Sequence, residues 1–298
     1  MTTPDLSVVV PSVNGWSDLH GCLAALRAGG TGLSVEVLVV DRVGDAVRQP
    51  VLETFGDVTL IEVAPGTPIP QMRALAMSRA LAPVVAVIED HVLVPPGWAR
   101  SMVDAQRRLG GVVGGALENA ATDRTVDWAA FLCEYGRVLP PLPAGPATWL
   151  TGNNTIYPRA VLDAHQDVLT AGRWEDFLHE ALRRAGTPLT CCPEIVVAHN
   201  LHGTMAGYLA QRYWYARSYA GSRASGWRLA HRVGFGCAAL FLPPILFART
   251  IASVWVKRRH RRELLRALPL LAVFAWASAA GDAIGSWRGA GPAFSRVC

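Results

Sequence analysis

The chain has 298 residues, of which 51% are hydrophobic and 17% charged, and its mean hydropathy is +0.25. Soluble domains typically carry about 25% charged residues, so this chain is short of charge. Its net charge of +5 is unevenly distributed: residues 1–222 hold 16 basic and 21 acidic side chains, and residues 223–298 hold 12 basic and two acidic ones. The C-terminal positive charges interrupt long apolar stretches instead of covering a polar face. This pattern argues against a nucleic-acid partner and favours a membrane surface.

The cysteines and the N-terminal segment indicate a reducing, cytoplasmic environment. The six cysteines show no zinc-type spacing and do not form the pattern of a disulfide framework. Residues 1–6 contain no basic stretch ahead of an apolar run, so no signal peptide is expected. We therefore expect the N-terminal part of the chain to lie in the cytoplasm.

Short apolar strands alternate with helices along the first third of the chain. Strands are expected at Ser7–Val10, Val35–Val40, Thr59–Val63 and Val84–Ile88, with helices at Asp18–Ala28 and Gln71–Leu81. Later elements are expected as strands at Val112–Leu117 and Ile195–Ala198 and helices at Arg173–Ala185 and Tyr208–Tyr219. Strands that are apolar on both faces are typical of a parallel sheet covered by helices. The sequence therefore predicts an α/β, Rossmann-like fold with a mostly parallel sheet flanked by helices.

Polar residues follow three of the predicted strands. Asn14, Asp41 and the triplet Glu89-Asp90-His91 each come after a strand, so they are expected to converge at the carboxyl edge of the sheet. Two carboxylates and an imidazole can share a divalent cation, which would neutralise a diphosphate leaving group. The alternative is a polar strand end that caps the following turn. No GxGxxG or Walker A pattern accompanies the first strand, so nothing in the sequence supports an ordinary dinucleotide or P-loop site.

Four segments in the same order resemble the family-2 glycosyltransferases. Val8–Asn14 looks like that family's opening strand and turn, and Glu36–Asp41 looks like its second strand. Ile88–His91 falls where the family has its Asp-x-Asp metal motif, and Pro95–Trp98 is similar to the segment that follows. The resemblance implies the glycosyltransferase-A fold, metal ligation by Glu89 and His91, and substrate contacts by Pro11, Asn14, Asp41 and Asp90. Glu89 and His91 replace the usual aspartates, so the motif does not choose between Mn²⁺ and Mg²⁺.

Further matches imply an acceptor side of the site. Arg73 stands where the family has a basic contact, and Gly152, Asn153 and Asn154 resemble its acceptor-side loop. Glu175 and Asp176 resemble the pair that supplies the catalytic base of inverting members. Asp176 would accept the proton of an acceptor hydroxyl, and Glu175 would orient the acceptor. The same two acids could also stabilise a helix N-terminus through its dipole, and both roles can hold together.

Two later segments have a functional and a structural interpretation. His199 falls where glycosyltransferase-A enzymes often place a late histidine near the metal, although a lone histidine is more often structural. Gln211, Arg212 and Trp214 form a variant of the Gln-x-x-Arg-Trp motif that holds the diphosphate and acceptor. The alternative for this segment is an amphipathic interfacial helix with aromatic anchors.

The C-terminal region contains two apolar stretches, Val233–Val256 and Leu264–Trp287, each long enough to cross a bilayer. The basic run Lys257–Arg262 lies between them. If the first stretch spanned the membrane, this run would fall on the far side from the catalytic domain, against the positive-inside rule. A re-entrant or interfacial arrangement and a simple two-span hairpin therefore both remain open.

Together these features predict two regions. Residues 1–222 are expected to form a glycosyltransferase-A catalytic domain, and residues 223–298 a basic, apolar, membrane-associated helical region. The expected reaction moves a sugar from a nucleoside diphosphate sugar to a lipid-linked or cell-envelope glycan acceptor, with inversion and a divalent cation. The expected location is the membrane, with the catalytic domain on the cytoplasmic side. The alternatives are a non-catalytic, nucleotide-sugar-binding membrane scaffold and a nucleotidyltransferase, which would need a basic triphosphate loop that Pro11–Gly15 lacks.

Overall fold

The computed structural model describes residues 3–29 and 32–297, which divide into two compact units. The first unit runs to Glu118 and resumes over Pro140–Asn200, and the second contains Asn119–Leu139 and the chain from Leu201 onward. The sequence places the domain boundary at residue 222. The two units are a division by packing, in which residues 119–139 and the segment from Leu201 pack with the C-terminal helices; the functional boundary at residue 222 stays a prediction.

The first unit is built on a mixed sheet. Its strands are β1 (Leu6–Ser12), β2 (Val35–Asp41), β3 (Thr59–Glu62), β4 (Val84–Val87), β5 (Val92–Leu93), β6 (Val112–Asn119), β7 (Gly145–Pro146), β8 (Thr155–Pro158) and β9 (Leu189–His199). Across the described residues these nine strands follow the order β3-β2-β1-β4-β8-β6-β9-β5, with β7 beside β9. The pairs among β3, β2, β1 and β4 are parallel, as the sequence predicts. β8 pairs antiparallel with β4 and β6, and β9 pairs antiparallel with β5 and β7.

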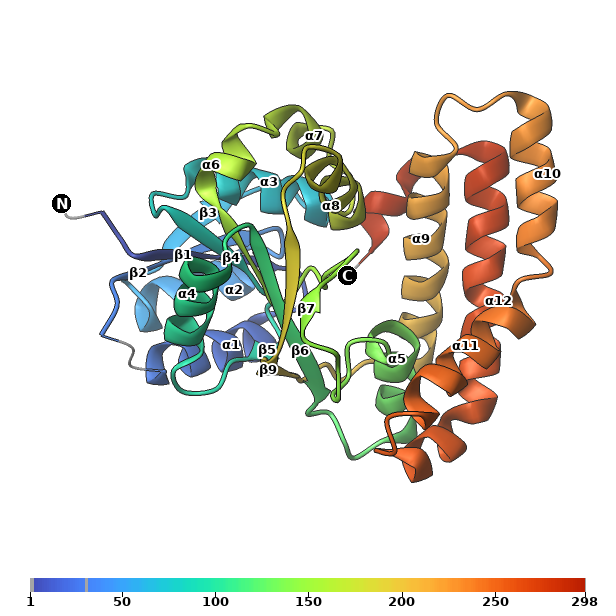
Figure 1. Ribbon diagram of the computed structural model, residues 1–298, viewed down its shortest axis with the longest axis horizontal. Helices are drawn as coiled ribbons and strands as arrows, with labels where there is room; N and C mark the ends of the chain where they lie inside the picture. The colour runs from blue at the N-terminus through green and yellow to red at the C-terminus, as the bar shows by residue number, and fades with distance from the viewer. Residues whose placement is uncertain (1–2, 30–31, 298) are drawn as a thin grey trace. The chain divides into compact units, whose positions relative to one another are not determined.

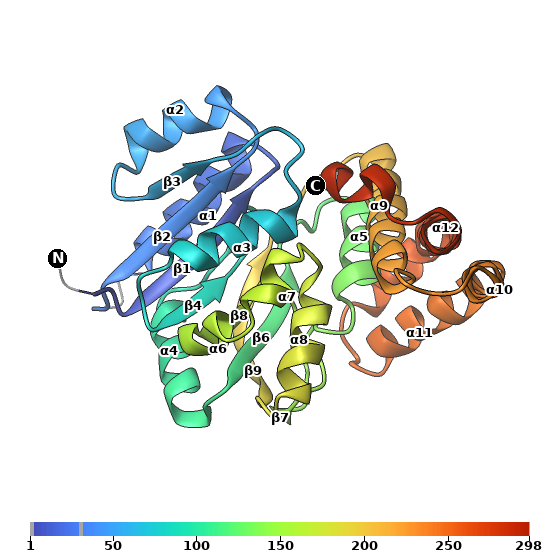
Figure 2. The same cartoon turned by 90° about the horizontal axis from the view of Figure 1, so that it is seen from above.

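Helices cover both faces of this sheet. They are α1 (Trp16–Ala28), α2 (Asp45–Thr54), α3 (Ile69–Arg79), α4 (Trp98–Leu109), α6 (Arg159–Asp163), α7 (Gln166–Thr170) and α8 (Glu175–Arg184). Figure 1 shows α3, α6, α7 and α8 over one face, and Figure 2 shows the same elements from above. Every residue of β1 is buried, because a central strand packs against helices on both sides. The predicted α/β fold class is therefore confirmed.

A buried polar pair joins α8 to the sheet. The Tyr157 hydroxyl on β8 lies 2.8 Å from His179 Nε2 on α8, and both residues are 1% exposed. The other nitrogen of His179, Nδ1, has no hydrogen-bond partner among the described residues. Burial lowers the pKa of His179 to about 4, so the ring is neutral at pH 7.

This pKa predicts an acid-sensitive contribution to stability. The folded state resists protonation that the unfolded chain accepts near pH 6.5, so the contribution is full above that pH and is lost as the pH falls toward 4. The shift corresponds to about 3 kcal/mol of unfolding free energy. Urea unfolding at pH 7.5 and pH 4.5 should show a larger loss in the wild type than in His179→Gln. Equal losses in the two proteins would contradict this assignment.

The second unit is helical. Its elements are α5 (Thr125–Tyr135), α9 (Met205–Arg223), α10 (Leu229–Ala239), α11 (Pro243–Trp255), α12 (Arg261–Arg288) and a short 3-10 helix, η1 (Gly291–Arg296). α12 packs along α9, where Gly281 and Gly285 let its backbone approach the carbonyl oxygens of Tyr213 and Arg217. A side chain at either glycine would overlap those oxygens.

The apolar C-terminal stretches are organised differently from one another. Within the described residues, α12 is the one unbroken helix that is long and apolar enough to cross a membrane. α10 and α11 reach that length only together, and they are bent by 58° at the break between them. Pro243 and Pro244, which begin α11, account for this break because proline cannot continue a helix from the preceding turn.

Candidate active site

The segment after β4 sends its two carboxylates in opposite directions. Asp90 is fully buried, and its Oδ2 accepts hydrogen bonds from the backbone N–H groups of Val13 (2.7 Å) and Asn14 (2.9 Å). Its Oδ1 accepts from Asn14 Nδ2 (2.7 Å) and lies 3.1 Å from His91 Nδ1. The sequence predicts a substrate contact for Asp90. In the structure both oxygens fix the turn after β1 and the ring of His91, and the substrate contact stays a prediction.

Glu89, His91 and His199 form a cluster at this edge of the sheet. One ligand atom from each residue lies within 4.8 Å of the others, and the two histidine Nε2 atoms are 2.9 Å apart. His199 reaches the cluster because β9 ends there, paired with β5. Asp90 holds the far nitrogen of His91, as carboxylates commonly do for metal-binding histidines. The three residues therefore fit a divalent cation, and the sequence prediction brought the same three together.

The charge state of this cluster is set by its hydrogen bonds. Burial alone would lower the pKa of His91, but its hydrogen bonds to Asp90 and Glu89 outweigh that effect and raise it to about 10. Burial would likewise raise the pKa of Glu89, but the hydrogen bond to His91 and the nearby positive charges hold it well below its usual range. Without a metal, the cluster therefore holds an anionic carboxylate beside a protonated imidazole. A divalent cation would take the place of that proton.

Arg73 connects this cluster to a second pair of acids. Its Nη2 donates to Glu89 Oε1 (3.1 Å) and its Nη1 donates to Glu175 Oε2 (3.0 Å). The arginine side chain is only 8% exposed, so both ion pairs are shielded from bulk water. α3 positions this fork, and α8 brings Glu175 to it from a hundred residues later in the chain. The prediction of a basic residue at the site is consistent with this position.

The loop before β8 supplies two different kinds of residue. Asn153 Nδ2 donates to Glu89 Oε2 (3.0 Å), so this asparagine belongs to the cluster. At Gly152 an added Cβ atom would overlap Glu175 Oε1 and Arg73 Nη1, so a larger residue would displace the ends of these two side chains. Asn154 is fully buried. Its amide group donates to the carbonyls of β6 and β9 and accepts from the Trp98 indole N–H, so it holds these elements together, and its substrate contact stays a prediction.

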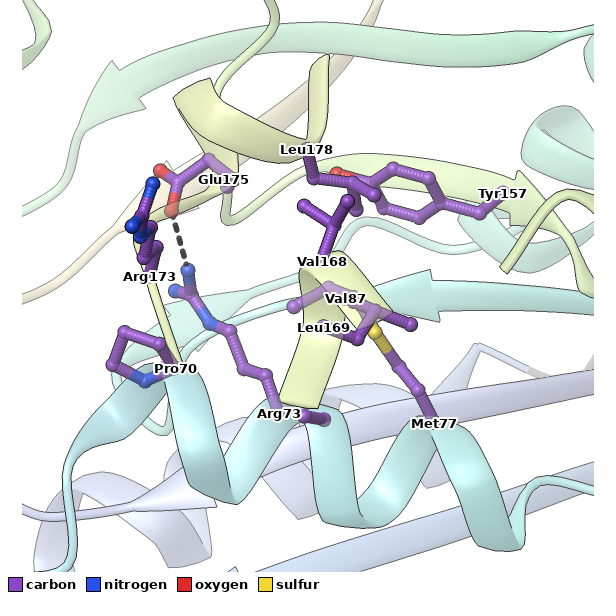
Figure 3. Close-up of a pocket in the computed structure, with 12 residues that line it drawn as sticks. Pro70, Arg73, Met77, Val87, Tyr157, Val168, Leu169, Arg173, Glu175 and Leu178 are labelled. Carbon is purple, nitrogen blue, oxygen red and sulfur yellow. Dashed lines mark hydrogen bonds and ion pairs between the residues drawn. The ribbon is translucent and has the colours of Figure 1, made fainter. Parts of the chain in front are cut away.

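The candidate base lies in the first turn of α8. Glu175 and Asp176 begin that helix, where its dipole favours negative charge. Glu175 turns toward Arg73, as Figure 3 shows, and Asp176 is partly exposed beside it. The two interpretations of this pair, helix stabilisation and catalysis, are compatible with the same position.

The ends of β1 and β2, where the nucleotide is expected to bind, are held by hydrogen bonds to Asp41. Asp41 is fully buried and accepts hydrogen bonds from Ser12 Oγ (3.0 Å), Gly44 N (2.9 Å) and Arg48 Nε (2.9 Å). Arg48, on α2, therefore covers the carboxylate that the sequence assigns to the nucleotide. Pro11 is buried in β1, next to Val40 of β2.

The predicted Gln-x-x-Arg-Trp variant lies on α9 in the second unit. There Arg212 is 7% exposed and pairs with Glu134, and the Arg296 guanidinium lies 4.7 Å from the Trp214 ring. Gln211 is partly buried on the same helix. These contacts give Arg212 a structural partner within its own unit.

Sequence reasoning missed two residues that shape the site, Arg48 and Gly115. Arg48 lies on a helix that was not predicted. Trp98, which belongs to the segment that resembles the family, anchors the loop through Asn154. A side chain at Gly115 would overlap Ile195 O and the Asn154 amide, so glycine at this position lets β6 pass close to them. The Gly114-Gly115 pair inside an apolar strand was the available signal, because strand glycines often mark close backbone approach.

Solved structures of one glycosyltransferase have a similar fold. The chain aligns with S. aureus TarS 1–349 at a TM-score of 0.52 and 13% identity, covering 93% of this chain and 90% of that one. TarS in complex with UDP aligns at a TM-score of 0.51 and 11% identity, and its complex with UDP-GlcNAc at 0.52 and 13%, with the same coverage. At this identity the likeness concerns the fold. No curated protein matches the chain.

The chain also matches a family model directly. The model described as glycosyl transferase family 2 aligns with residues 7–163. This range is more than half of the chain and runs from β1, through the segments that hold Arg73, Glu89 and His91, to the end of α6. The match bears out the resemblance drawn from the strand ends. The protein is a family-2 glycosyltransferase.

Proposed function

We propose that this protein transfers a sugar from a nucleoside diphosphate sugar to a lipid-linked or cell-envelope acceptor, with inversion at the anomeric carbon. The proposal is carried by the fork of Arg73, which joins Glu89 of the histidine–carboxylate cluster to Glu175 of the acidic pair. Arg73 thus joins the cluster that would face the diphosphate to Glu175, the carboxylate that would orient the acceptor hydroxyl. The UDP and UDP-GlcNAc complexes of TarS support a donor of the same chemical class.

The proposed reaction is a single displacement. Asp176 accepts the proton of the acceptor hydroxyl while its oxygen forms a bond to the anomeric carbon. The bond from that carbon to the diphosphate oxygen breaks, and the nucleoside diphosphate leaves with the electron pair. Arg73 offers positive charge to the departing phosphates and keeps Glu175 in place beside the base. Asp90 acts indirectly, by holding the turn at Asn14 and the ring of His91.

A divalent cation held by Glu89, His91 and His199 would neutralise the charge that develops on the leaving diphosphate. Two imidazoles and one carboxylate suit Mn²⁺ better than Mg²⁺, because Mg²⁺ prefers oxygen ligands. We therefore expect Mn²⁺ to support donor binding at lower concentrations than Mg²⁺.

A thermal-shift panel tests the donor and the metal together. Nucleoside diphosphate sugars carrying uridine, guanosine or thymidine are added to the purified protein with Mn²⁺, with Mg²⁺ or with EDTA. The expected result is stabilisation by at least one donor, strongest with Mn²⁺ and lost in His199→Ala. His165→Ala, at a histidine of the first unit outside the cluster, is the matched control. The absence of metal-dependent stabilisation by any donor would contradict the proposal and favour the scaffold alternative.

We also propose that residues 1–222 contain the catalytic domain and that the C-terminal helices attach it to the cytoplasmic face of a membrane. Nucleotide sugars are cytoplasmic, and the C-terminal region combines an excess of basic residues with exposed apolar side chains. Phe241, at the break between α10 and α11, is 79% exposed, and Ile245, in the first turn of α11, is 54% exposed. Apolar side chains flanked by arginines are typical of an interfacial surface on anionic lipid.

This attachment predicts a measurable loss on substitution. Phe241→Glu together with Ile245→Glu should weaken binding to vesicles that contain anionic lipid by at least about tenfold, because two apolar side chains no longer enter the interface. Leu52→Glu, at a 60% exposed leucine of α2 in the first unit, is the matched control. Flotation of each protein with vesicles is the measurement. Unchanged flotation of the double variant would place the attachment elsewhere.

A further inference from the structure

A small pocket opens in the first unit between α3, α7 and α8. Its lining includes Ala74, Met77 and Leu169, and the volume open to the centre of a water molecule is about 30 Å³. On this measure a single water molecule needs about 10–15 Å³, so the pocket has room for a group of one or two heavy atoms. It lies beside the Arg73–Glu175 ion pair but forms no part of the histidine–carboxylate cluster.

The two ends of this pocket differ in chemistry. Figure 3 shows Arg173, the guanidinium of Arg73 and the carboxylate of Glu175 gathered at one end. The other end is closed by apolar and aromatic side chains, namely Met77, Val87, Leu169, Leu178 and Tyr157. A substituent that enters from the polar end therefore contacts apolar side chains at the other end.

At the apolar end of the pocket, the Tyr157 hydroxyl already has a partner. Arg73 donates to two carboxylates, and the Tyr157 hydroxyl is bonded to His179 Nε2. A sugar hydroxyl placed among the apolar side chains would lose its hydrogen bonds to water and gain few in return, which is costly. A methyl group placed there would be favoured, because it leaves water without losing any hydrogen bond. The apolar end of the pocket thus discriminates against a hydroxyl and in favour of a methyl group.

We propose that this pocket receives a methyl-bearing substituent of the transferred sugar. The inference rests on the proposed function, in which the sugar lies between the diphosphate centre at Glu89 and the base Asp176. Arg73 and Glu175 stand between those two groups and also form the polar end of the pocket. A substituent on the sugar ring is therefore presented at that end. Two sugar classes carry the required group: 2-acetamido sugars, through the acetyl methyl, and 6-deoxy sugars, through the C6 methyl.

The test compares matched donors in proteins whose pocket has been altered. Ala74→Leu adds carbon at the pocket wall, and Leu169→Ala, at a partly exposed residue, enlarges the space. Ala181→Leu introduces the same change as Ala74→Leu at a partly exposed position of α8 outside the pocket lining, and serves as the control. Melting temperatures establish that each variant is folded before binding is measured.

The donors are paired so that each pair differs in the methyl-bearing group. UDP-N-acetylglucosamine is compared with UDP-glucose, and GDP-L-fucose with GDP-L-galactose, alongside the donors of the full panel. The expected result is that the donor bound most tightly carries an acetamido or a 6-deoxy group, by about tenfold over its partner, as apolar pockets commonly discriminate. Ala74→Leu should abolish that preference while the partner donor binds as before. The pair whose preference Ala74→Leu abolishes shows whether the methyl group belongs to an acetamido or a 6-deoxy sugar.

Several outcomes would overturn the inference. One is a best-bound donor that has neither group. Another is an Ala74→Leu variant that weakens both members of a pair equally, or that behaves like Ala181→Leu. A wild-type protein that binds donors without preference contradicts the pocket assignment and leaves the proposed function intact. A wild-type protein that binds no donor contradicts the proposed function itself, and the pocket assignment falls with it.

Discussion

Replacing Asp176 with asparagine should lower the rate of sugar transfer by about 10²–10⁴-fold, the range expected when a general base is removed. Asparagine keeps the size and shape of the side chain but cannot accept the proton of the acceptor hydroxyl. The partly exposed position of Asp176, in the first turn of α8, should tolerate the change with little loss of stability. Donor affinity should stay within about twofold of the wild type, because the donor is held at the Glu89 side of the Arg73 network.

The measurement is the release of nucleoside diphosphate from the donor that binds best, with donor affinity determined in parallel. Asp167→Asn, at an exposed aspartate of α7, is the matched control and should be as active as the wild type. Transfer by Asp176→Asn at the wild-type rate would remove this residue from the mechanism. A parallel loss of donor affinity would show that Asp176 acts in binding instead.

Replacing Arg73 with glutamine should affect both stability and activity. It leaves Glu89 and Glu175 without their shared partner, and breaking buried ion pairs of this kind costs about 3 kcal/mol of unfolding free energy. Transfer should fall by about 10²-fold or more, because the charge facing the departing phosphates is lost. Arg73→Lys should recover only part of either effect, since an ammonium group cannot reproduce the two-armed fork.

Urea unfolding and nucleoside diphosphate release measure the two effects separately. Arg79→Gln, at an exposed arginine at the end of the same helix, is the matched control. Two results would contradict the bridging role: an Arg73→Gln variant as stable as Arg79→Gln, or an Arg73→Lys variant with full activity.

The parallel half of the sheet could be predicted because its residues leave few alternatives. Runs such as Val8–Val10 and Val37–Val40 are too short for helices and apolar on both faces, so they form central strands. The polar residues that follow these strands are then expected at the carboxyl edge of the sheet. The antiparallel half was not predictable in the same way. β8 and β6 pair across a long separation in sequence, and their register depends on tertiary contacts such as those of Asn154.

Within the site, the sequence identified residues but not their orientations. Glu89 and Asp90 are neighbours of the same chemical type, and only the packing shows that one faces Arg73 and the other is buried beneath the turn at Asn14. The covering of Asp41 by Arg48 was missed for a related reason. Pro50 interrupts the helical pattern of residues 45–54, so α2 was not predicted and its arginine had no assigned position.

The most direct test of the central claim is the transfer of labelled sugar into membrane lipid. The purified protein is incubated with its best-bound donor, labelled in the sugar, and with a lipid extract from membranes, in the presence of Mn²⁺ or EDTA. The proposed function predicts that label enters the organic phase with Mn²⁺, that EDTA prevents it, and that Asp176→Asn does not support it. Label that stays in the intact donor under both conditions, although the donor binds, would contradict the claim.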